Sequence, residues 1–473
     1  MLSCAAVTTK ASIRRSNLPL ASVAGYGAGN FAFALLGLVV AVNLQFFYTD
    51  YVGLSAGLVS WVLLFARLFD AFADPVMGWI SDRTKTGFGR RRPYIVGSAI
   101  PLGISFCMLF APPDLGDAAQ HQGELLAYLL LFYTLTYFIW TVGAIPYYSL
   151  GAELSDDYNE RLKVIAVREA WGLVGLLAAT ILPAYLIDLY GGRQGYGAMG
   201  AILGLGTATF LFFSGVFVRE RPEFRGRPAL NPYAGIVATL RNPHFRVLLT
   251  AFTFSGIAAA VPAVLVIYVS VYIIGTPQWW EQSIPSWMPT WSYYLLLYFL
   301  SAVVSLPLWN RLGERFGKRA TWGVAILLAT VTSAACFWLS PGGIGYFSAI
   351  LVLGGISFGN YQALPPSMVA DLIDHDEVHT GLRREGAYFA VWSFAAKVGN
   401  AVTGFAALQV LEHVGYQPGV PQTETVRLWM LWMYSWFPAL FYFLAGVALV
   451  RFRYSREDLA AAQLKLGRGA AAG

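Results

Sequence analysis

The chain has 473 residues, of which 57% are hydrophobic and only 12% are charged. Soluble domains carry about a quarter charged residues, so this composition excludes an ordinary soluble fold and predicts a chain solvated by lipid. The formal net charge is +6, but the basic residues lie in loops between apolar segments, which argues against a nucleic-acid partner. Three cysteines without CxxC spacing predict neither a disulfide framework nor a metal site.

Twelve apolar segments follow one another along the chain, each long enough to cross a bilayer, which takes about 20 residues. We therefore expect an all-α membrane protein. Residues 1–21 contain basic residues but no apolar core before a cleavage site, so they predict a cytoplasmic tail and not a signal peptide. The twelve segments are 22–48, 57–80, 93–111, 125–149, 164–187, 199–218, 246–274, 291–310, 320–339, 344–369, 386–411 and 427–450.

The distribution of Lys and Arg predicts the orientation. With the N-terminus inside, 27 of the 32 basic residues fall on the inner side, and only Arg193 and Arg427 fall outside. This asymmetry alternates through all twelve segments and predicts that both termini are cytoplasmic. A basic, Pro-rich stretch divides six segments from six. We expect a cytoplasmic tail at 1–21, six-helix bundles at 22–218 and 246–450, a cytoplasmic linker at 219–245 and a second cytoplasmic tail at 451–473.

The two halves resemble each other in sequence. GWISDRTKTGFGRRRPYIVG (78–97) follows the second segment and LWNRLGERFGKRATWG (308–323) follows the eighth; both have an acid–Arg pair and then Phe-Gly-basic-basic. IPYYSLGAEL (145–154) and LPPSMVADLI (364–373) likewise follow the fourth and tenth segments. Convergent loop composition is the alternative, but the equivalent positions favour an internal duplication, which is typical of transporters that rock two halves about a midplane site.

Three charged residues lie within the second apolar segment. In FARLFDAFADPVMGWI (65–80), Arg67, Asp70 and Asp74 recur at i, i+3 and i+7 and share one helix face. A charge at mid-bilayer costs about 2.5–3.5 kcal/mol, and two carboxylates one turn apart repel each other, so they favour a shared proton or a bound cation. A structural ion pair of Arg67 with one acid is the alternative, although it leaves the second acid unpaired.

Polar residues in other helices are candidates for a solute site. Lys397 is the only lysine inside a predicted helix, and snorkelling is its alternative explanation. Arg168, near the start of the fifth segment, belongs either to an inner gate or to the cavity. Polar groups beside aromatic rings suit a hydroxyl-rich ring, although each aromatic alone is also explained by packing. These residues are Tyr26, Asn30, Trp140, Thr141, Tyr147, Tyr148, Trp392 and Ser393.

The block RLFDAFADPVMGWISDRTKTGFGRRRP (67–93) closely resembles the signature of the glycoside–pentoside–hexuronide:cation symporters, the melibiose permease-like branch of the major facilitator superfamily. FYTDYVGLS (47–55), IPYYSLGAEL and MVADLIDHDEVHTGLRREGAYFAVWSFAAKVG (368–399) also match its pattern, and the resemblance runs from residue 20 to 452. It implies the major facilitator fold, with two pseudo-symmetric six-helix bundles, and symport of a sugar or glycoside with H⁺ or Na⁺ by alternating access.

The resemblance also implies roles for individual residues. Asp70 and Asp74 match the family's cation-site carboxylates, and Thr141 matches its hydroxyl ligand. The expected substrate-binding residues are Tyr26, Asn30, Tyr148, Arg168, Trp392, Ser393 and Lys397; of these, Asn30, Tyr148, Arg168, Trp392 and Lys397 are expected to line one central cavity. The loops that resemble the family's cytoplasmic gate contain Asp82, Arg83, Glu153, Arg161, Asp371 and Arg384.

The sequence departs from melibiose permease at the solute and cation sites. Asn30 and Ala144 stand where the permease has sugar-binding aspartates, and Tyr148 stands where it has a tryptophan. A galactoside held by two carboxylates is therefore not expected. Ala73 replaces an asparagine beside the cation site; losing that oxygen removes a potential Na⁺ ligand and favours H⁺ coupling.

Other functions remain as alternatives. The same fold carries other small solutes or an amphiphile such as a lysolipid. HExxH and nucleotide-loop motifs are absent from the sequence, and no sizeable soluble domain could hold a reaction site, so an enzyme is not expected; the repeat argues against a channel or receptor. We expect a multi-pass protein of a bacterial inner membrane, with a small-molecule substrate, no cofactor besides the coupling ion and no obligate protein partner.

The orientation can be tested with topology reporters fused at Gly473 and near Pro228. Because the basic loops predict that the C-terminal tail and the central linker are cytoplasmic, both fusions should report cytoplasm. A periplasmic signal from either fusion would contradict the predicted topology.

Overall fold

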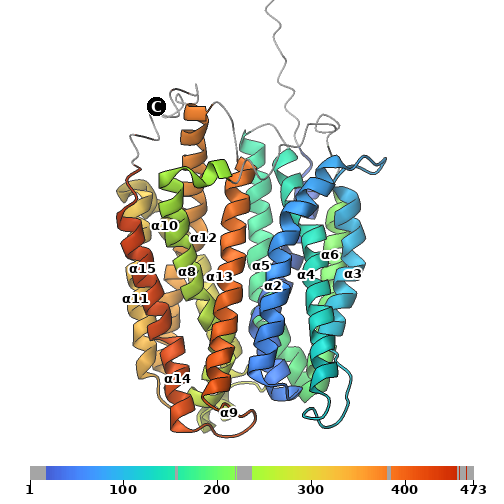
Figure 1. The fold of residues 1–473 in the computed structure, drawn as a ribbon, viewed down its shortest axis with the longest axis vertical. Helices are drawn as coiled ribbons and strands as arrows, with labels where there is room; N and C mark the ends of the chain where they lie inside the picture. The colour runs from blue at the N-terminus through green and yellow to red at the C-terminus, as the bar shows by residue number, and fades with distance from the viewer. Residues whose placement is uncertain are drawn as a thin grey trace, which may run out of the picture.

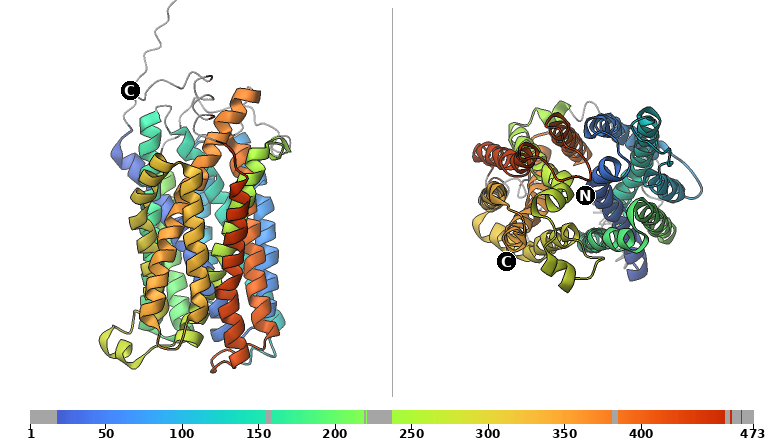
Figure 2. Two further views of the ribbon diagram at one scale, coloured as in Figure 1. Left: turned by 90° about the vertical axis from the view of Figure 1, so that its left-hand side faces the viewer. Right: turned by 90° about the horizontal axis from the view of Figure 1, so that it is seen from below.

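The structure is a computed structural model, and it describes residues 18–154, 158–218, 220, 237–380, 385–454, 458 and 465. This part of the chain contains 12 helices long and apolar enough to cross a membrane, so the predicted all-α membrane fold is confirmed. The helices form two groups that lie side by side, blue to green and yellow to red in Figure 1, and the view along the bundle in Figure 2 separates the two halves.

Six long helices form each half. In the first half they are α1 (Leu20–Phe46) with the π-helical turn η1 (Phe47–Tyr51), α2 (Ala56–Arg83), α3 (Arg92–Leu109), α4 (Gln122–Glu153), α5 (Tyr158–Tyr190) and α6 (Gly192–Phe217). In the second half they are α8 (Pro243–Val269) with the π-helical turn η3 (Ser270–Ile274), the short α9 (Gln278–Ser283), α10 (Thr290–Phe316), α11 (Lys318–Ala335) with η4 (Cys336–Trp338), α12 (Ile344–Thr380), α13 (Glu385–His413) and the pair α14 (Glu424–Tyr434) and α15 (Trp436–Val450).

The final predicted helix is broken, and a proline explains the break. The prediction was one continuous segment, 427–450, but α14 ends at Tyr434 and α15 begins at Trp436. Pro438 lies in the first turn of α15, where its missing N–H needs no partner. In a continuous helix the ring of Pro438 would clash with the carbonyl of Tyr434, four residues earlier. α12 is longer than predicted. Its polar final turns continue past the predicted end at residue 369 to Thr380.

Glycine contacts bring α3 and α6 together. A Cβ added at Gly103 would lie 2.6 Å from the carbonyl oxygen of Gly204, and a Cβ at Gly204 would lie 2.6 Å from that of Gly103. The two backbones therefore approach more closely than any side chain allows. Such small-residue contacts drive helix association where the surrounding solvent is as apolar as the helices themselves.

Polar contacts join the two halves at one end of the bundle, which we call the α1–α2 end because η1 leads to α2 there. Asp50 of η1 accepts hydrogen bonds from Tyr416 (2.7 Å) and Tyr272, both in the second half. Thr49 and Tyr268 share a hydrogen bond of 2.8 Å between their hydroxyls. Burial and the adjacent Asp50 raise the pKa of the Tyr416 phenol, so this hydroxyl stays protonated and continues to donate.

Further hydrogen bonds between the halves lie at the same end. They link Gly57 to Glu412 and Gln409, Ser60 to Gln409, Thr180 to Ser292, and Asp188 to Ser286. In the described part of the chain, the contacts between the halves are thus concentrated at the α1–α2 end. The opposite end, where α2 ends and α3 begins, we call the α2–α3 end.

Replacing Asp50 by Asn should loosen the α1–α2 end, because hydrogen bonds to a charged acceptor contribute about 1.5–3 kcal/mol each. Ala260 lines a cavity of about 400 Å³ between the halves. In a cysteine-free background carrying Ala260→Cys, Asp50→Asn should increase the rate of labelling by a membrane-impermeant maleimide on intact cells by about tenfold. Asp114→Asn, a change at an exposed loop carboxylate of the same end, is the control. Equal rates in both variants would contradict a closure that depends on Asp50.

Candidate functional site

The two predicted cation-site carboxylates share one ammonium group from the other half of the molecule. Lys397 Nζ on α13 lies 2.9 Å from Asp70 Oδ2 and 2.7 Å from Asp74 Oδ2 on α2. The Thr141 hydroxyl on α4 lies 2.7 Å from Asp70 Oδ1 and 2.9 Å from Asp74 Oδ1. Because that hydroxyl has one proton, it donates to one carboxylate at a time. These four residues are called the carboxylate cluster below.

The carboxylate cluster is buried. Side-chain exposure is 2% for Asp70, 15% for Asp74 and 21% for Lys397, and Thr141 is 1% exposed. Two carboxylates and one ammonium leave one negative charge in excess within the cluster, and the Arg67 guanidinium, which interacts electrostatically with Asp70, offsets part of it. A buried charge must be paired or hydrogen-bonded, so the cluster favours one further monovalent cation or a proton.

The Arg67 guanidinium donates hydrogen bonds to the hydroxyl groups of two tyrosines. Its Nε donates to the Tyr133 hydroxyl at 2.9 Å and its Nη2 to the Tyr137 hydroxyl at 2.6 Å. Its guanidinium also lies 3.8 Å from the centre of the Tyr137 ring, which adds a cation–π contact. The alternative drawn from the sequence, an ion pair of Arg67 with one of the acids, is therefore not the arrangement in the structure, and both acids pair with Lys397 instead.

Three of the predicted solute residues form a second polar cluster within the first half. Asn30 Nδ2 on α1 donates to the backbone oxygen of Arg168 on α5 at 3.0 Å, and the Tyr148 hydroxyl on α4 donates to Asn30 Oδ1 at 3.4 Å. The Arg168 guanidinium lies 5.3 Å from the centre of the Tyr148 ring and pairs with Glu169. An amide, a phenol and a guanidinium thus come together in the first half.

Of the other predicted solute residues, Tyr26 adjoins this cluster through a side-chain hydrogen bond with Arg168, whereas Trp392 and Ser393 lie on α13 in the second half. Tyr26 is fully buried, stacks on Tyr147 at 4.6 Å between ring centres, and donates to the Tyr147 backbone oxygen, so it packs α1 against α4. Trp392 stacks on Phe252 of α8 at 3.7 Å. Ser393 is exposed.

A cavity of about 400 Å³ lies between the halves, on the side of the carboxylate cluster toward the α1–α2 end. Arg67 and Gln45 line it from the first half, and Asn400 and Tyr294 line it from the second. The side-chain oxygens of Gln45 and Tyr294 are buried without a hydrogen-bond partner among the described residues. The five residues expected to share one cavity are not among its lining residues: Asn30, Tyr148, Arg168, Trp392 and Lys397.

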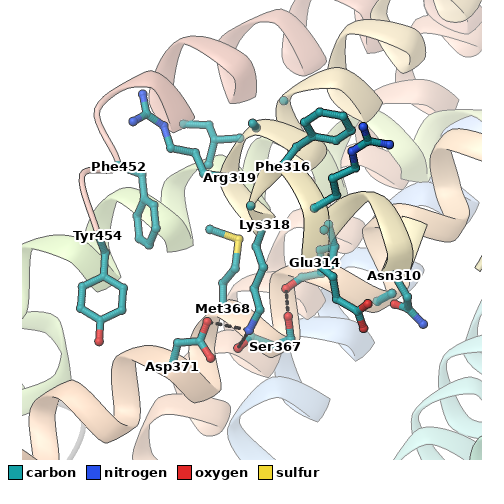
Figure 3. Close-up of a pocket in the computed structure, with 18 of the residues that line it drawn as sticks. Asn310, Glu314, Phe316, Lys318, Arg319, Ser367, Met368, Asp371, Phe452 and Tyr454 are labelled. Carbon is teal, nitrogen blue, oxygen red and sulfur yellow. Dashed lines mark hydrogen bonds and ion pairs between the residues drawn. The ribbon is translucent and has the colours of Figure 1, made fainter. Parts of the chain in front are cut away.

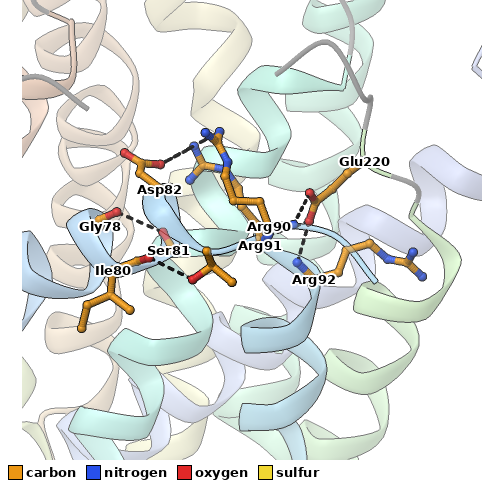
Figure 4. Close-up of polar contacts among 9 residues, drawn as sticks. Gly78, Ile80, Ser81, Asp82, Arg90, Arg91, Arg92 and Glu220 are labelled. Carbon is orange, nitrogen blue, oxygen red and sulfur yellow. Dashed lines mark hydrogen bonds and ion pairs between the residues drawn. The ribbon is translucent and has the colours of Figure 1, made fainter. Parts of the chain in front are cut away.

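The described gate residues make contacts within their own halves. Asp371 on α12 pairs with Lys318 at the start of α11, 2.6 Å from Oδ2 to Nζ (Figure 3). Asp82 at the end of α2 lies 3.1 Å from the Arg91 guanidinium (Figure 4), and Arg83 covers the ring of Trp79 at 4.0 Å. The remaining gate predictions, the side chains of Glu153 and Arg161 and the whole of Arg384, lie outside the described residues.

Two functional candidates did not emerge from the sequence. Asp50 stands at the edge of an apolar segment, where an acid is an ordinary interfacial residue. Glu220 lies in the linker, but its carboxylate accepts hydrogen bonds from the backbone N–H groups of Arg90, Arg91 and Arg92 at 2.6, 2.6 and 2.7 Å (Figure 4). In the sequence, Glu220 is conspicuous as an acid among many basic residues. No spacing in the sequence connects it with Arg92, which lies 128 positions earlier.

Comparison with known proteins identifies the family. The family described as MFS/sugar transport proteins matches residues 25–456. The chain belongs to this family. The match covers almost all of both halves, in agreement with the resemblance found in the sequence.

Relatives of this chain are named as symporters and sugar transporters. The inner membrane symporter YicJ of Escherichia coli is 26% identical over 90% of this chain and 90% of its own. The isoprimeverose transporter of Lactiplantibacillus pentosus is 26% identical over 94% of this chain and 91% of its own. Among solved structures, the match to the nucleoside transporter NupG covers 92% of this chain and 100% of the NupG chain with a TM-score of 0.63 at 14% identity, which supports the major facilitator fold.

Proposed function

We propose that the chain is a secondary transporter that couples a cation gradient to the uptake of a sugar or glycoside by alternating access, with the carboxylate cluster as its coupling site. The observation that carries the proposal is that Lys397 of one half is held by Asp70 and Asp74 of the other. The family and the names of the relatives support the solute class. We also propose that the α2–α3 end faces the cytoplasm, as the basic loops predict.

In the arrangement described, Lys397 stands where a coupling cation would bind. Its ammonium satisfies both carboxylates and ties α13 to α2 across the interface between the halves. A cation entering between Asp70 and Asp74 competes with the ammonium for the same oxygens. Breaking a buried pair on one side only costs about 3–5 kcal/mol, so ion entry and the separation of α13 from α2 are energetically linked.

H⁺ is the coupling ion that the residues favour. Thr141 and the two carboxylates supply oxygen ligands, but the Lys397 ammonium already holds an oxygen of each carboxylate, which leaves few for a Na⁺ ion. Ala73, beside Asp74 in the sequence, adds none. A proton needs only one carboxylate oxygen, and the Thr141 hydroxyl can accept or donate in response.

The polar cluster of Asn30, Tyr148 and Arg168 suits a neutral, hydroxylated solute. It presents an amide and a phenol, while the Glu169 carboxylate is paired with Arg168, and the ring of Tyr148 offers an apolar face for the C–H side of a sugar. In this proposal the cluster binds the solute. The central cavity lined by Gln45 and Asn400 then provides room on the α1–α2 side.

Removing both carboxylates should uncouple transport. We expect the Asp70→Asn, Asp74→Asn double variant to lose accumulation against a gradient while retaining downhill exchange, because the solute cluster is left intact. The measurement is uptake of a panel of radiolabelled glycosides into proteoliposomes, with an imposed pH gradient or Na⁺ gradient or with neither.

Asp117→Asn, in the exposed loop between α3 and α4, is the matched control and should accumulate solute normally. Gradient-driven accumulation by the double variant would place the coupling site elsewhere. A panel in which the wild-type protein transports none of the glycosides would contradict the solute class itself.

Lys397→Gln should increase the affinity of the site for its cation, because it removes the group that competes for the carboxylates. A charge-assisted hydrogen bond contributes about 1.5–3 kcal/mol, so the half-saturating cation concentration should fall about tenfold or more. The assay is solute exchange measured against pH and Na⁺ concentration. Lys163→Gln is the control for lost positive charge, and an unchanged or weaker cation affinity in Lys397→Gln would contradict the competition.

A further inference from the structure

A cavity of about 980 Å³ lies at the α2–α3 end of the second half, away from the carboxylate cluster. The ends of α10, α11, α12 and α15 surround it (Figure 3). Neither the proposed coupling site nor the solute cluster contributes to its lining. Among its lining residues, Asp371 is a predicted gate residue and pairs with Lys318.

Basic side chains outnumber acidic ones around this cavity. Lys318 is neutralised by Asp371. The rest of the lining contains one acid, Glu314, and three arginines, so basic residues are in excess, and guanidinium groups match the geometry of a phosphate. The arginines are Arg315, Arg319 and Arg453.

The equivalent place in the first half is already filled by an anion. There, Phe88-Gly89 precedes Arg90 to Arg92, and the Glu220 carboxylate accepts hydrogen bonds from all three of their backbone N–H groups (Figure 4). The fit is close, because a Cβ on Gly89 would lie 2.6 Å from Glu220 Oε1. Glu220 is the third residue after α6, the last helix of that half.

The second half repeats the motif without the carboxylate. Phe316-Gly317 precedes Lys318, Arg319 and Ala320, and Gly317 has a positive φ of 89°, as Gly89 has a positive φ of 125°. The third residue after α15, in the place of Glu220, is Arg453. Within the described part of the chain, the backbone N–H groups of residues 318–320 donate to no side chain. The start of α11 therefore offers the same three donors with an arginine where the first half has its acid.

The walls beside the cavity suit acyl chains. Gly323 and Gly446 line its floor, and a Cβ on Gly323 would meet open space. Val324 and Leu327 of α11 and Val447 of α15 are exposed on the outside of the helices. A soluble anion would use only the charged rim, whereas a lipid would use both the rim and this apolar surface.

We propose that this cavity binds an anionic membrane phospholipid, whose phosphate occupies at α11 the position that the Glu220 carboxylate occupies at α3. The phosphate accepts hydrogen bonds from the first turn of α11 and pairs with Arg319 and Arg453. The acyl chains lie along α11 and α15.

The test uses the purified, delipidated full chain and native mass spectrometry with phosphatidylglycerol, with phosphatidylcholine as the uncharged-lipid comparison. The wild-type protein should retain phosphatidylglycerol in preference to phosphatidylcholine. Arg453→Glu supplies the acid that the first half already has, so it should weaken phosphatidylglycerol binding about tenfold or more. Arg451→Glu makes the same charge change two residues away, outside the cavity lining, and should bind like the wild type.

Arg453→Gln serves as the second variant if Arg453→Glu does not fold, and it should weaken binding in the same direction. Unchanged binding in the folded Arg453 variant, or equal loss in Arg451→Glu, would overturn the site. Equal retention of the two lipids would overturn the requirement for an anionic phosphate. Displacement of the lipid by millimolar glycerol 3-phosphate would identify the ligand as a soluble phosphate ester and overturn the lipid assignment.

Discussion

The burial of two carboxylates one helical turn apart is the constraint on which the arrangement of the two halves depends. Asp70 and Asp74 cannot both stay ionised in an apolar environment without a partner. The partner comes from the other half, as Lys397 of α13, and the Thr141 hydroxyl supplies the remaining contact. The interface between α2 and α13 is therefore held by charges, and in the proposed mechanism the same atoms serve both packing and coupling.

The two halves contain the same motif with different partners. Each has a glycine in a left-handed conformation followed by basic residues that open a helix. In the first half, the Glu220 carboxylate accepts hydrogen bonds from the backbone of these basic residues. In the second half, Lys318 pairs with Asp371, and a cavity lies beside them. The backbone geometry is similar in both halves because it depends on the glycine, whereas the nearby side chains differ.

The helices were predictable from the sequence because a lipid-exposed span requires a long apolar run, and all twelve were found. Asp70 and Asp74 were also selected, since charge in an apolar helix is conspicuous, and the resemblance to the symporter family added Thr141. The pairing with Lys397 could not be predicted, because it joins positions 323 residues apart and depends on how the halves pack. The helix break at Ser435 and the hydrogen bonds of Asp50 to the second half were not predicted either. Pro438 and Asp50 lie near the edges of apolar segments, where proline and acidic residues are common.

The π-helical turns at the ends of α1 and α8 have a mechanical consequence. Both lie at the α1–α2 end, and between them they include Thr49, Asp50 and Tyr272. A π turn holds one residue more than an α turn, so relaxing it to α geometry rotates everything beyond it by about 100°. Asp50 can then swing away from Tyr272 and Tyr416 while the body of α1 stays where it is. The first helix of each half thus ends in a turn whose change to α geometry would by itself separate Asp50 from these phenols.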